Sequence, residues 1–320
     1  MNGERQVVVV ARVLLPAGRD RLAERFELRE GGHEVTRADL LELAPGAGAI
    51  VADPSVPVDA ELLDAAGPQL EVVANFAVGY DNVDLEACRE RGIAVTNTPD
   101  VLTEATAELA MALTLAAARR MSDAERDLRA GHWRGWDPAA YRGIEIGGST
   151  VGVVGMGRIG HRYARLTHGL GAQIVYAGPT PKPQAEQELG ARRLEFEELL
   201  AAADVVSLHA PSTPDTQGLI GARELELIGP QGVLVNTSRG PLVDSEAVAA
   251  ALEAGTLGAA GLDVYKNEPE VSPRLLKAPR CVLLPHIGSA TVTARDAMAN
   301  AVADNVIAVL EGREPPSRVA

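Results

Sequence analysis

Short apolar runs rich in β-branched residues alternate along the chain with segments in which Ala, Leu and Glu recur at the helical period. This alternation is typical of βαβ units and predicts parallel sheets. Strands are predicted at residues 7–10, 49–51, 70–74 and 93–95, and again at 149–154, 173–176, 204–208, 232–236, 258–264 and 281–285. Long helices are predicted at residues 103–119 and 291–310.

Residues 121–148 interrupt the alternation and contain both tryptophans, in the stretch GHWRGWDP. The six strands predicted after this break match the content of a complete doubly wound dinucleotide-binding domain. Because that domain begins in the middle of the chain, we expect it to be inserted into a second, smaller α/β domain. The helix at 291–310 then returns to the smaller domain.

The composition narrows the classes of protein and partner. Of 320 residues, 46% are apolar, which is typical of a globular protein, and the formal net charge is −14. Such a charge repels phosphate backbones, so no nucleic-acid partner is expected. Two cysteines, Cys88 and Cys281, provide neither a disulfide framework nor a metal cluster, and they favour a reduced, cytoplasmic setting. No membrane segment is predicted.

A glycine motif follows the strand at 149–154. The stretch VGVVGMGRIGH contains Gly155, Gly157 and Gly160 in G-x-G-x-x-G spacing, between a strand and a helix. Gly155 allows the tight turn, Gly157 lets the backbone approach a pyrophosphate, and Gly160 permits close helix–strand packing. An ordinary glycine turn is the alternative, but the later strands in order favour dinucleotide binding.

The second strand of this domain ends without the acid that usually binds the ribose of NAD. That position, about 20 residues beyond the motif, falls at Gly178 in VYAGPTPKPQ. Without a carboxylate nothing repels a 2′-phosphate, and Lys182 and the Thr180 hydroxyl can attract one. The alternative is that Lys182 is a solvated charge in a permissive loop. The sequence favours NADP(H) and leaves NAD(H) possible.

Three polar residues follow three later strands: Arg239, Glu268 and His286. In an open doubly wound sheet, ligands bind beyond the carboxyl ends of the strands, so all three can face one crevice. His286 can donate a proton to a 2-keto acid during hydride transfer, Glu268 can orient and tune the imidazole, and Arg239 can bind a carboxylate or carbonyl. Singly, these residues could be a loop ion pair, a solvated turn residue and a helix flank.

The chain resembles the D-isomer-specific 2-hydroxyacid dehydrogenases, and among them the glyoxylate/hydroxypyruvate reductases. The resemblance covers almost the whole length and rests on NFAVGYDNVD, VTNTPDVLTEATAELAMAL, GMGRIG, VNTSRGPLVD, GLDVYKNEP and LPHIGSAT. It implies a Rossmann-type doubly wound parallel sheet at 99–289, inserted into a smaller flavodoxin-like α/β substrate domain at 1–98 and 290–320. It also implies that Arg239, Glu268 and His286 are catalytic.

The resemblance implies further site residues. The backbone of Val78 and Gly79 would hold the substrate carboxylate with Arg239 and His286, although an ordinary β-turn is the alternative for this loop. Asp263 would bond the nicotinamide carboxamide. The full expected cofactor set is Thr106, Gly155, Gly157, Arg158, Ile159, Gly160, Gly178, Thr180, Lys182, His209, Ala210, Pro211, Thr237, Ser238, Asp263, His286 and Gly288. NADP-preferring members often carry an arginine where this chain has Pro179.

Partners and alternatives follow from the same comparison. GHWRGWDP matches a segment of subunit contact, so a homodimer is expected, with Trp136 either approaching the partner's active site or only packing at the interface. The leading interpretation is reduction of glyoxylate or hydroxypyruvate, small 2-keto acids, with NADPH. Alternatives are an NAD-linked dehydrogenase of another 2-hydroxy acid, such as a D-lactate or 3-phosphoglycerate enzyme, and a dinucleotide-sensing corepressor-like protein. Formate dehydrogenases of the same fold usually have glutamine at the position of Glu268, so this glutamate argues against that activity.

Overall fold

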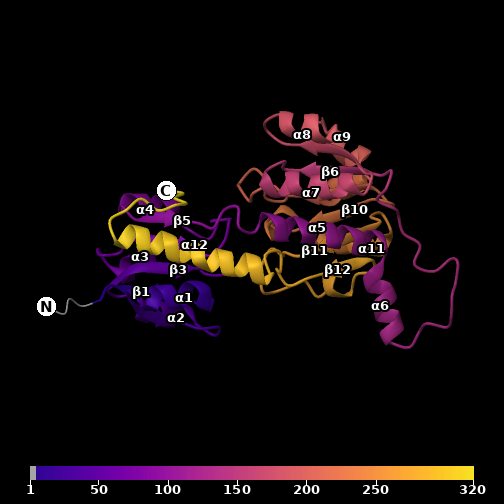
Figure 1. Cartoon of the computed structure of the whole chain (residues 1–320). Coiled ribbons are helices and arrows are strands. Elements are labelled where there is room, and N and C mark those ends of the chain that lie inside the picture. Colours follow the sequence, from indigo (N-terminus) through magenta and orange to yellow (C-terminus); the bar gives the residue numbers. More distant parts are fainter. Residues whose placement is uncertain (1–4) are drawn as a thin grey trace. The chain divides into compact units, whose positions relative to one another are not determined.

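The computed structural model describes residues 5–320, so residues 1–4 of the predicted first domain lie outside the described part. The chain divides into two compact units, Met1–Leu102 with Ser289–Ala320, and Thr103–Gly288. These boundaries lie four residues and one residue from the expected ones. Figure 1 shows an α/β arrangement in each unit, with helices beside the sheet.

The first unit contains a five-stranded sheet in the order β2-β1-β3-β4-β5, and every strand pair is parallel. This is the flavodoxin-like order. Its elements are β1 (Val7–Val10), α1 (Pro16–Ala23), β2 (Glu27–Glu30), α2 (Arg37–Leu43), β3 (Ala47–Ala52), α3 (Ala60–Ala66), β4 (Val72–Asn75), α4 (Leu85–Glu90), β5 (Ala94–Thr96) and α12 (Val292–Leu310).

The second unit contains a seven-stranded parallel sheet in the order β12-β11-β10-β9-β6-β7-β8. Read from β8, this is the usual dinucleotide-binding order with one additional strand, β12. Its elements are α5 (Thr103–Ala118), α6 (Met121–Arg129), β6 (Thr150–Val154), α7 (Arg158–Gly169), β7 (Gln173–Ala177), α8 (Pro183–Leu189), β8 (Arg192–Arg193), α9 (Phe196–Ala202), β9 (Val205–Leu208), α10 (Ala222–Ile228), β10 (Val233–Asn236), α11 (Ser245–Ala254), β11 (Ala259–Leu262) and β12 (Cys281–Leu283), with short 3₁₀ turns η1 (Gly240–Leu242) and η2 (Leu275–Lys277).

Most interior strands are buried along their whole length, as expected for parallel sheets covered on both faces. Every residue of β3, β4, β9, β10 and β11 is buried. Apolar runs without polar alternation therefore identify these strands in the sequence. Side-chain caps start several of the helices between them: Asp59, Asp84, Asp244 and Thr291 each accept a backbone N–H of the first helical turn.

Two strands, β2 and β8, were not predicted from the sequence, and both lie at an edge of their sheet. The sequence of β2 is ELRE, with two exposed and two half-buried residues, and β8 consists of two exposed arginines. An edge strand needs no apolar run, because one side of it faces solvent. The six strands predicted for this unit therefore leave out β8, the third strand along the chain, and include β12, the additional seventh strand.

Candidate active site

The glycine motif forms a tight turn between β6 and α7. Gly155 has φ of +94°, and a Cβ there would lie 2.7 Å from the amide nitrogen of Ala210. A Cβ on Gly160 would lie 2.2 Å from the carbonyl oxygen of Gly155. Both positions therefore require glycine: the first for its left-handed backbone and close neighbour, the second for helix–strand contact.

The start of α7 can receive an anion. Gly157 is the N-cap residue, no side chain caps the helix, and a Cβ on Gly157 would meet no atom within 4 Å. Arg158 is exposed and Ile159 is half-buried in the first turn. Uncapped amide groups and the positive end of the helix dipole suit a pyrophosphate, so the residues present fit a dinucleotide.

The segments after β9 and β10 border the same turn. Ser238 Oγ donates to the carbonyl of Ala210, which joins the two segments. The hydroxyl of Thr237 is buried and has no hydrogen-bond partner among the described residues, as expected for a group that a bound ligand completes. Burial lowers the pKa of His209 to about 3, so the imidazole is neutral near pH 7. Pro211 is exposed.

His286 and Glu268 form a close pair beyond β12 and β11. Nδ1 of His286 donates to Oε2 of Glu268 at 2.6 Å, and the amide of Tyr265 donates to Oε1 at 2.8 Å. Burial raises the pKa of Glu268, but the hydrogen bonds from His286 and Tyr265 and the charges of His286 and Arg239 outweigh it, so the pKa is below its ordinary value of 4.5. The carboxylate stays ionised at neutral pH, and Nε2 of His286 remains for a substrate.

Asp263, at the end of β11, fixes the loop that carries His286. Its two carboxylate oxygens accept the amides of Ile287 and Gly288, each at 2.8 Å, and its carbonyl accepts the amide of His286 at 2.8 Å. Burial raises the pKa of Asp263, although these amides and the charge of His286 oppose the shift. His286 has φ of +53°, a conformation that non-glycine residues rarely adopt. This positioning role of Asp263 was not predicted from the sequence.

Arg239 follows β10, whose neighbour in the sheet is β11. Its Nη1 donates to the carbonyl of Ser238 at 2.8 Å, and its own carbonyl accepts Nδ2 of Asn236 at 2.9 Å. Its charge contributes to the lowered pKa of Glu268. Arg239, Glu268 and His286 therefore follow three adjacent strands at one edge of the sheet. Thr106, on α5, lies beside the loop that carries His286, because a Cβ on Gly288 would lie 3.5 Å from its Cγ2.

The loop after β4, in the first unit, is held by its carbonyl groups. Nδ2 of Asn97 donates to the carbonyl of Val78 at 2.7 Å, and Nδ2 of Asn75 donates to the carbonyl of Gly79 at 2.8 Å. Within residues 5–320, the amides of Val78 and Gly79 have no hydrogen-bond acceptor. Two such N–H groups in succession suit an anion.

Gly178, the first residue of the loop after β7, has free space around it. A Cβ on Gly178 would meet no atom within 4 Å. Thr180 is exposed, Lys182 is half-buried, and the amide of Lys182 donates to the Tyr176 hydroxyl at 2.8 Å. The carbonyl of Gly178 accepts Nη2 of Arg193 at 2.9 Å, a contact that was not predicted because β8 was not.

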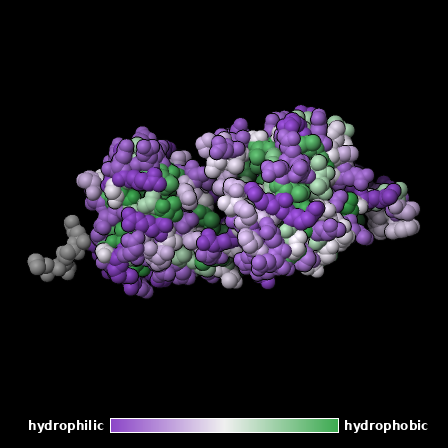
Figure 2. All heavy atoms as spheres, turned by 90° about the horizontal axis from the view of Figure 1, so that it is seen from above, coloured by the Kyte–Doolittle hydropathy of each residue, from purple (hydrophilic) through white to green (hydrophobic). Residues whose placement is uncertain are grey.

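The segment from α6 to residue 148 carries exposed apolar side chains and extends away from the sheet of its unit (Figure 1). Trp136 is 86% exposed, and Trp133, Leu128 and Met121 are also exposed. Figure 2 shows apolar green areas scattered among hydrophilic purple ones on the visible surface. Exposed tryptophans on a projecting segment are typical of an interface with another chain.

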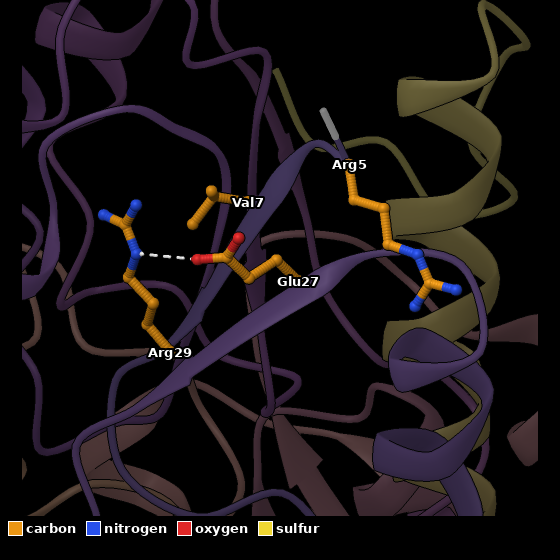
Figure 3. A pocket seen from close by; sticks show the side chains of 4 residues that line it. All are labelled: Arg5, Val7, Glu27 and Arg29. Atoms are coloured by element: carbon orange, nitrogen blue, oxygen red, sulfur yellow. Dashed lines mark ion pairs between the residues drawn. The ribbon is translucent and has the colours of Figure 1, made fainter. Parts of the chain in front are cut away.

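One surface hollow of the first unit is lined by Arg5, Val7, Glu27 and Arg29 (Figure 3), where Arg29 pairs with Glu27 at 3.5 Å and donates to the carbonyls of Leu43 and Pro45. In residues 5–320 no cluster of His, Cys, Asp or Glu could hold a metal ion. No helix in the same range has the length and apolar character needed to cross a membrane.

Comparison with known proteins identifies the family. A family model described as D-isomer specific 2-hydroxyacid dehydrogenase, NAD binding domain, matches residues 111–288. A glyoxylate reductase of Thermococcus litoralis is 45% identical over 312 residues, which cover 95% of this chain and 94% of that protein.

Solved structures agree with this match over nearly the full length. The TT0316 protein from Thermus thermophilus is 45% identical, with a TM-score of 0.92, covering 98% of this chain and 100% of that one. An NADPH-dependent glyoxylate/hydroxypyruvate reductase from Sinorhizobium meliloti, solved with NADP and malonate, is 38% identical, with a TM-score of 0.86, covering 99% of this chain and 97% of that one. This chain belongs to the D-isomer specific 2-hydroxyacid dehydrogenase family, whose members are NAD(P)-dependent enzymes.

Proposed function

We propose that this enzyme reduces glyoxylate and hydroxypyruvate to the corresponding 2-hydroxy acids, with NADPH preferred over NADH. The observation that carries the proposal is the 2.6 Å pair between His286 and an ionised Glu268, placed beside Arg239 at the carboxyl edge of the sheet. The glyoxylate reductases and the NADPH-dependent reductase among its relatives support the choice of substrate and cofactor.

The proposed chemistry assigns one task to each group. The bound nicotinamide cofactor supplies the hydride. His286 donates a proton from Nε2 to the carbonyl oxygen, because Nδ1 is engaged by Glu268. Glu268 stabilises the imidazolium before that transfer, and Arg239 neutralises the negative charge that develops on the oxygen. The amides of Val78 and Gly79 are proposed to bind the substrate carboxylate.

The cofactor is proposed to lie on the glycine turn and the adjoining loops. Gly155, Gly157 and Gly160, with Arg158 and Ile159, would receive the pyrophosphate. The adenosine side would contact His209, Ala210 and Pro211, and Gly178, Thr180 and Lys182 would border the ribose. The nicotinamide side would contact Thr106, Thr237, Ser238, Asp263, His286 and Gly288. The orphaned Thr237 hydroxyl and the uncapped start of α7 support this placement.

The test is a matrix of initial rates. NADPH and NADH are each combined with glyoxylate, hydroxypyruvate and pyruvate, and kcat/KM is reported for all six pairs. We expect the highest values for NADPH with glyoxylate or hydroxypyruvate. A maximum with NADH and pyruvate would instead identify an NAD-linked enzyme for another 2-hydroxy acid. If no pair is turned over, the enzymatic proposal is wrong and a dinucleotide-binding protein becomes the better interpretation.

We also propose a homodimer in a reduced, cytoplasmic setting. The exposed segment around Trp136 supports self-association, and both cysteines are buried and unpaired. Sedimentation velocity of the purified enzyme is expected to give a dimer. Trp136→Ala should weaken it, whereas Leu276→Ala, at an exposed apolar residue elsewhere on the same unit, should not. A wild-type monomer would contradict the proposal.

A further inference from the structure

The loop at residues 178–182, named the ribose loop, has no phosphate ligand at its first two positions. Gly178 replaces the usual acid and Pro179 stands where a cation is expected. A 2′-phosphate bound at this loop therefore needs a positive charge either from Lys182 or from another part of the chain. Lys182, the basic residue of the loop, is half-buried at the start of α8, four residues beyond Gly178, and its ammonium offers a point charge without the planar donor fork of an arginine.

The edge strand β8 brings an arginine to the loop. Arg193 is paired with Tyr176 in the parallel register of β7 and β8, two residues before Gly178. Its Nε donates to the carbonyl of Gly178 at 3.2 Å, and its Nη2 donates to the carbonyls of Gly178 at 2.9 Å and Pro179 at 3.4 Å. The guanidinium therefore contacts Gly178, the position at which an acid usually binds the ribose of NAD.

The charge of Arg193 is not neutralised by the chain. Its hydrogen bonds are to neutral carbonyls, and within residues 5–320 it forms no ion pair. Glu186, the first acid after the ribose loop, lies on α8 and accepts a hydrogen bond from the Tyr176 hydroxyl at 2.6 Å. A guanidinium has five N–H donors, and the bonds above use Nε and Nη2, so Nη1 keeps its donors for a ligand. Arg193 is thus an exposed cation in a chain whose formal net charge is −14.

We propose that Arg193 binds the 2′-phosphate of NADPH and sets the preference for the phosphorylated cofactor. The guanidinium of Arg193, on β8, thereby performs the role of the arginine that NADP-preferring members often carry at the position of Pro179. The same side chain fixes the loop by holding the carbonyls of Gly178 and Pro179. This inference rests on the proposed preference for NADPH and names the residue that produces it.

The experiment measures binding directly. The dissociation constants of NADPH, NADH and adenosine 2′,5′-bisphosphate are determined by isothermal titration calorimetry for the wild type, Arg193→Ala and Arg193→Lys. Arg192→Ala is the matched control, because it removes the neighbouring arginine of β8, whose side chain alternates to the other face. Circular dichroism confirms that each variant is folded.

We expect Arg193→Ala to weaken binding of NADPH and the bisphosphate roughly tenfold or more, the effect of losing hydrogen bonds to a charged group. Binding of NADH should change by less than about twofold, and Arg193→Lys should be intermediate because it keeps the charge without the planar fork. Arg192→Ala should resemble the wild type.

Three outcomes would overturn the inference. Equal losses for NADPH and NADH in Arg193→Ala would show that Arg193 only shapes the loop. A wild type that prefers NADPH, with the preference retained in Arg193→Ala, would place the phosphate ligand elsewhere while leaving the proposed function intact. A wild type that binds NADPH no better than NADH would overturn the cofactor preference itself, and with it this role of Arg193.

Discussion

The His286 loop and the ribose loop both follow strands at the carboxyl edge of one sheet, but they are held in different ways. Buried Asp263 binds the amides of the His286 loop with both carboxylate oxygens, and Glu268 fixes the imidazole. The ribose loop is held by the Tyr176 hydroxyl on one side and by exposed Arg193 on the other. The proposed reaction centre is fixed by one buried carboxylate, Asp263, whereas the proposed ligand of the 2′-phosphate, Arg193, is an exposed side chain that can change without disturbing the chemistry.

Removing the imidazole should have the largest effect. His286→Ala is expected to lower kcat roughly 10²- to 10⁴-fold, the usual contribution of a general acid, and to leave the Kd of NADPH nearly unchanged. Single-turnover kinetics and calorimetry would measure the two quantities. His286→Asn is the matched variant, because asparagine tolerates the φ of +53° better than alanine and also lacks a suitable proton donor. A kcat near that of the wild type in both variants would exclude His286 from the reaction.

Arg239→Lys tests whether the planar fork matters as well as the charge. We expect kcat/KM for glyoxylate to fall roughly 10- to 100-fold, since a lost hydrogen bond to a charged group costs about 1.5–3 kcal/mol. Steady-state kinetics measure the fall. Arg223→Lys is the control, at an exposed arginine on α10 that pairs with Glu197. If both variants behave like the wild type, Arg239 does not bind substrate through its fork.

Restoring an acid to the ribose loop should alter cofactor choice alone. Gly178→Asp is expected to weaken NADPH binding roughly 5- to 30-fold relative to NADH, because a carboxylate beside a phosphate at the surface costs about 1–2 kcal/mol. The new side chain has space, since a Cβ at this position meets no atom within 4 Å. Gly178→Asn provides the same size without the charge. Should the ratio of the two dissociation constants stay the same in Gly178→Asp, the ribose loop does not set cofactor preference.

The two loops also differ in how far the sequence reveals them. Gly155, Gly160 and the three catalytic candidates stand next to apolar strands, so their positions follow from the strand pattern. Arg193 stands on a two-residue edge strand of exposed arginines, which has no apolar pattern to detect. Its contact with Gly178 spans 15 residues and depends on the pairing of β7 with β8. The bonds of Asp263 to Ile287 and Gly288 likewise join distant segments.

The smallest expected effect is a change in pH dependence that separates the carboxylate's charge from its place in the loop. Because the pKa of Glu268 is lowered, its charge is present at neutral pH and is lost only as the pH falls through that lowered pKa. Glu268→Gln keeps the size of the side chain and one of the two acceptor oxygens, but it removes the charge that stabilises the imidazolium. Wild-type kcat for reduction should therefore fall as the pH drops through the lowered pKa of Glu268, and this acidic limb should be absent from the pH profile of Glu268→Gln. Glu270→Gln, at an exposed acid of the same loop, is the control. An acidic limb that persists in Glu268→Gln would mean that the charge of Glu268 does not contribute to the reaction and that this residue only orients His286.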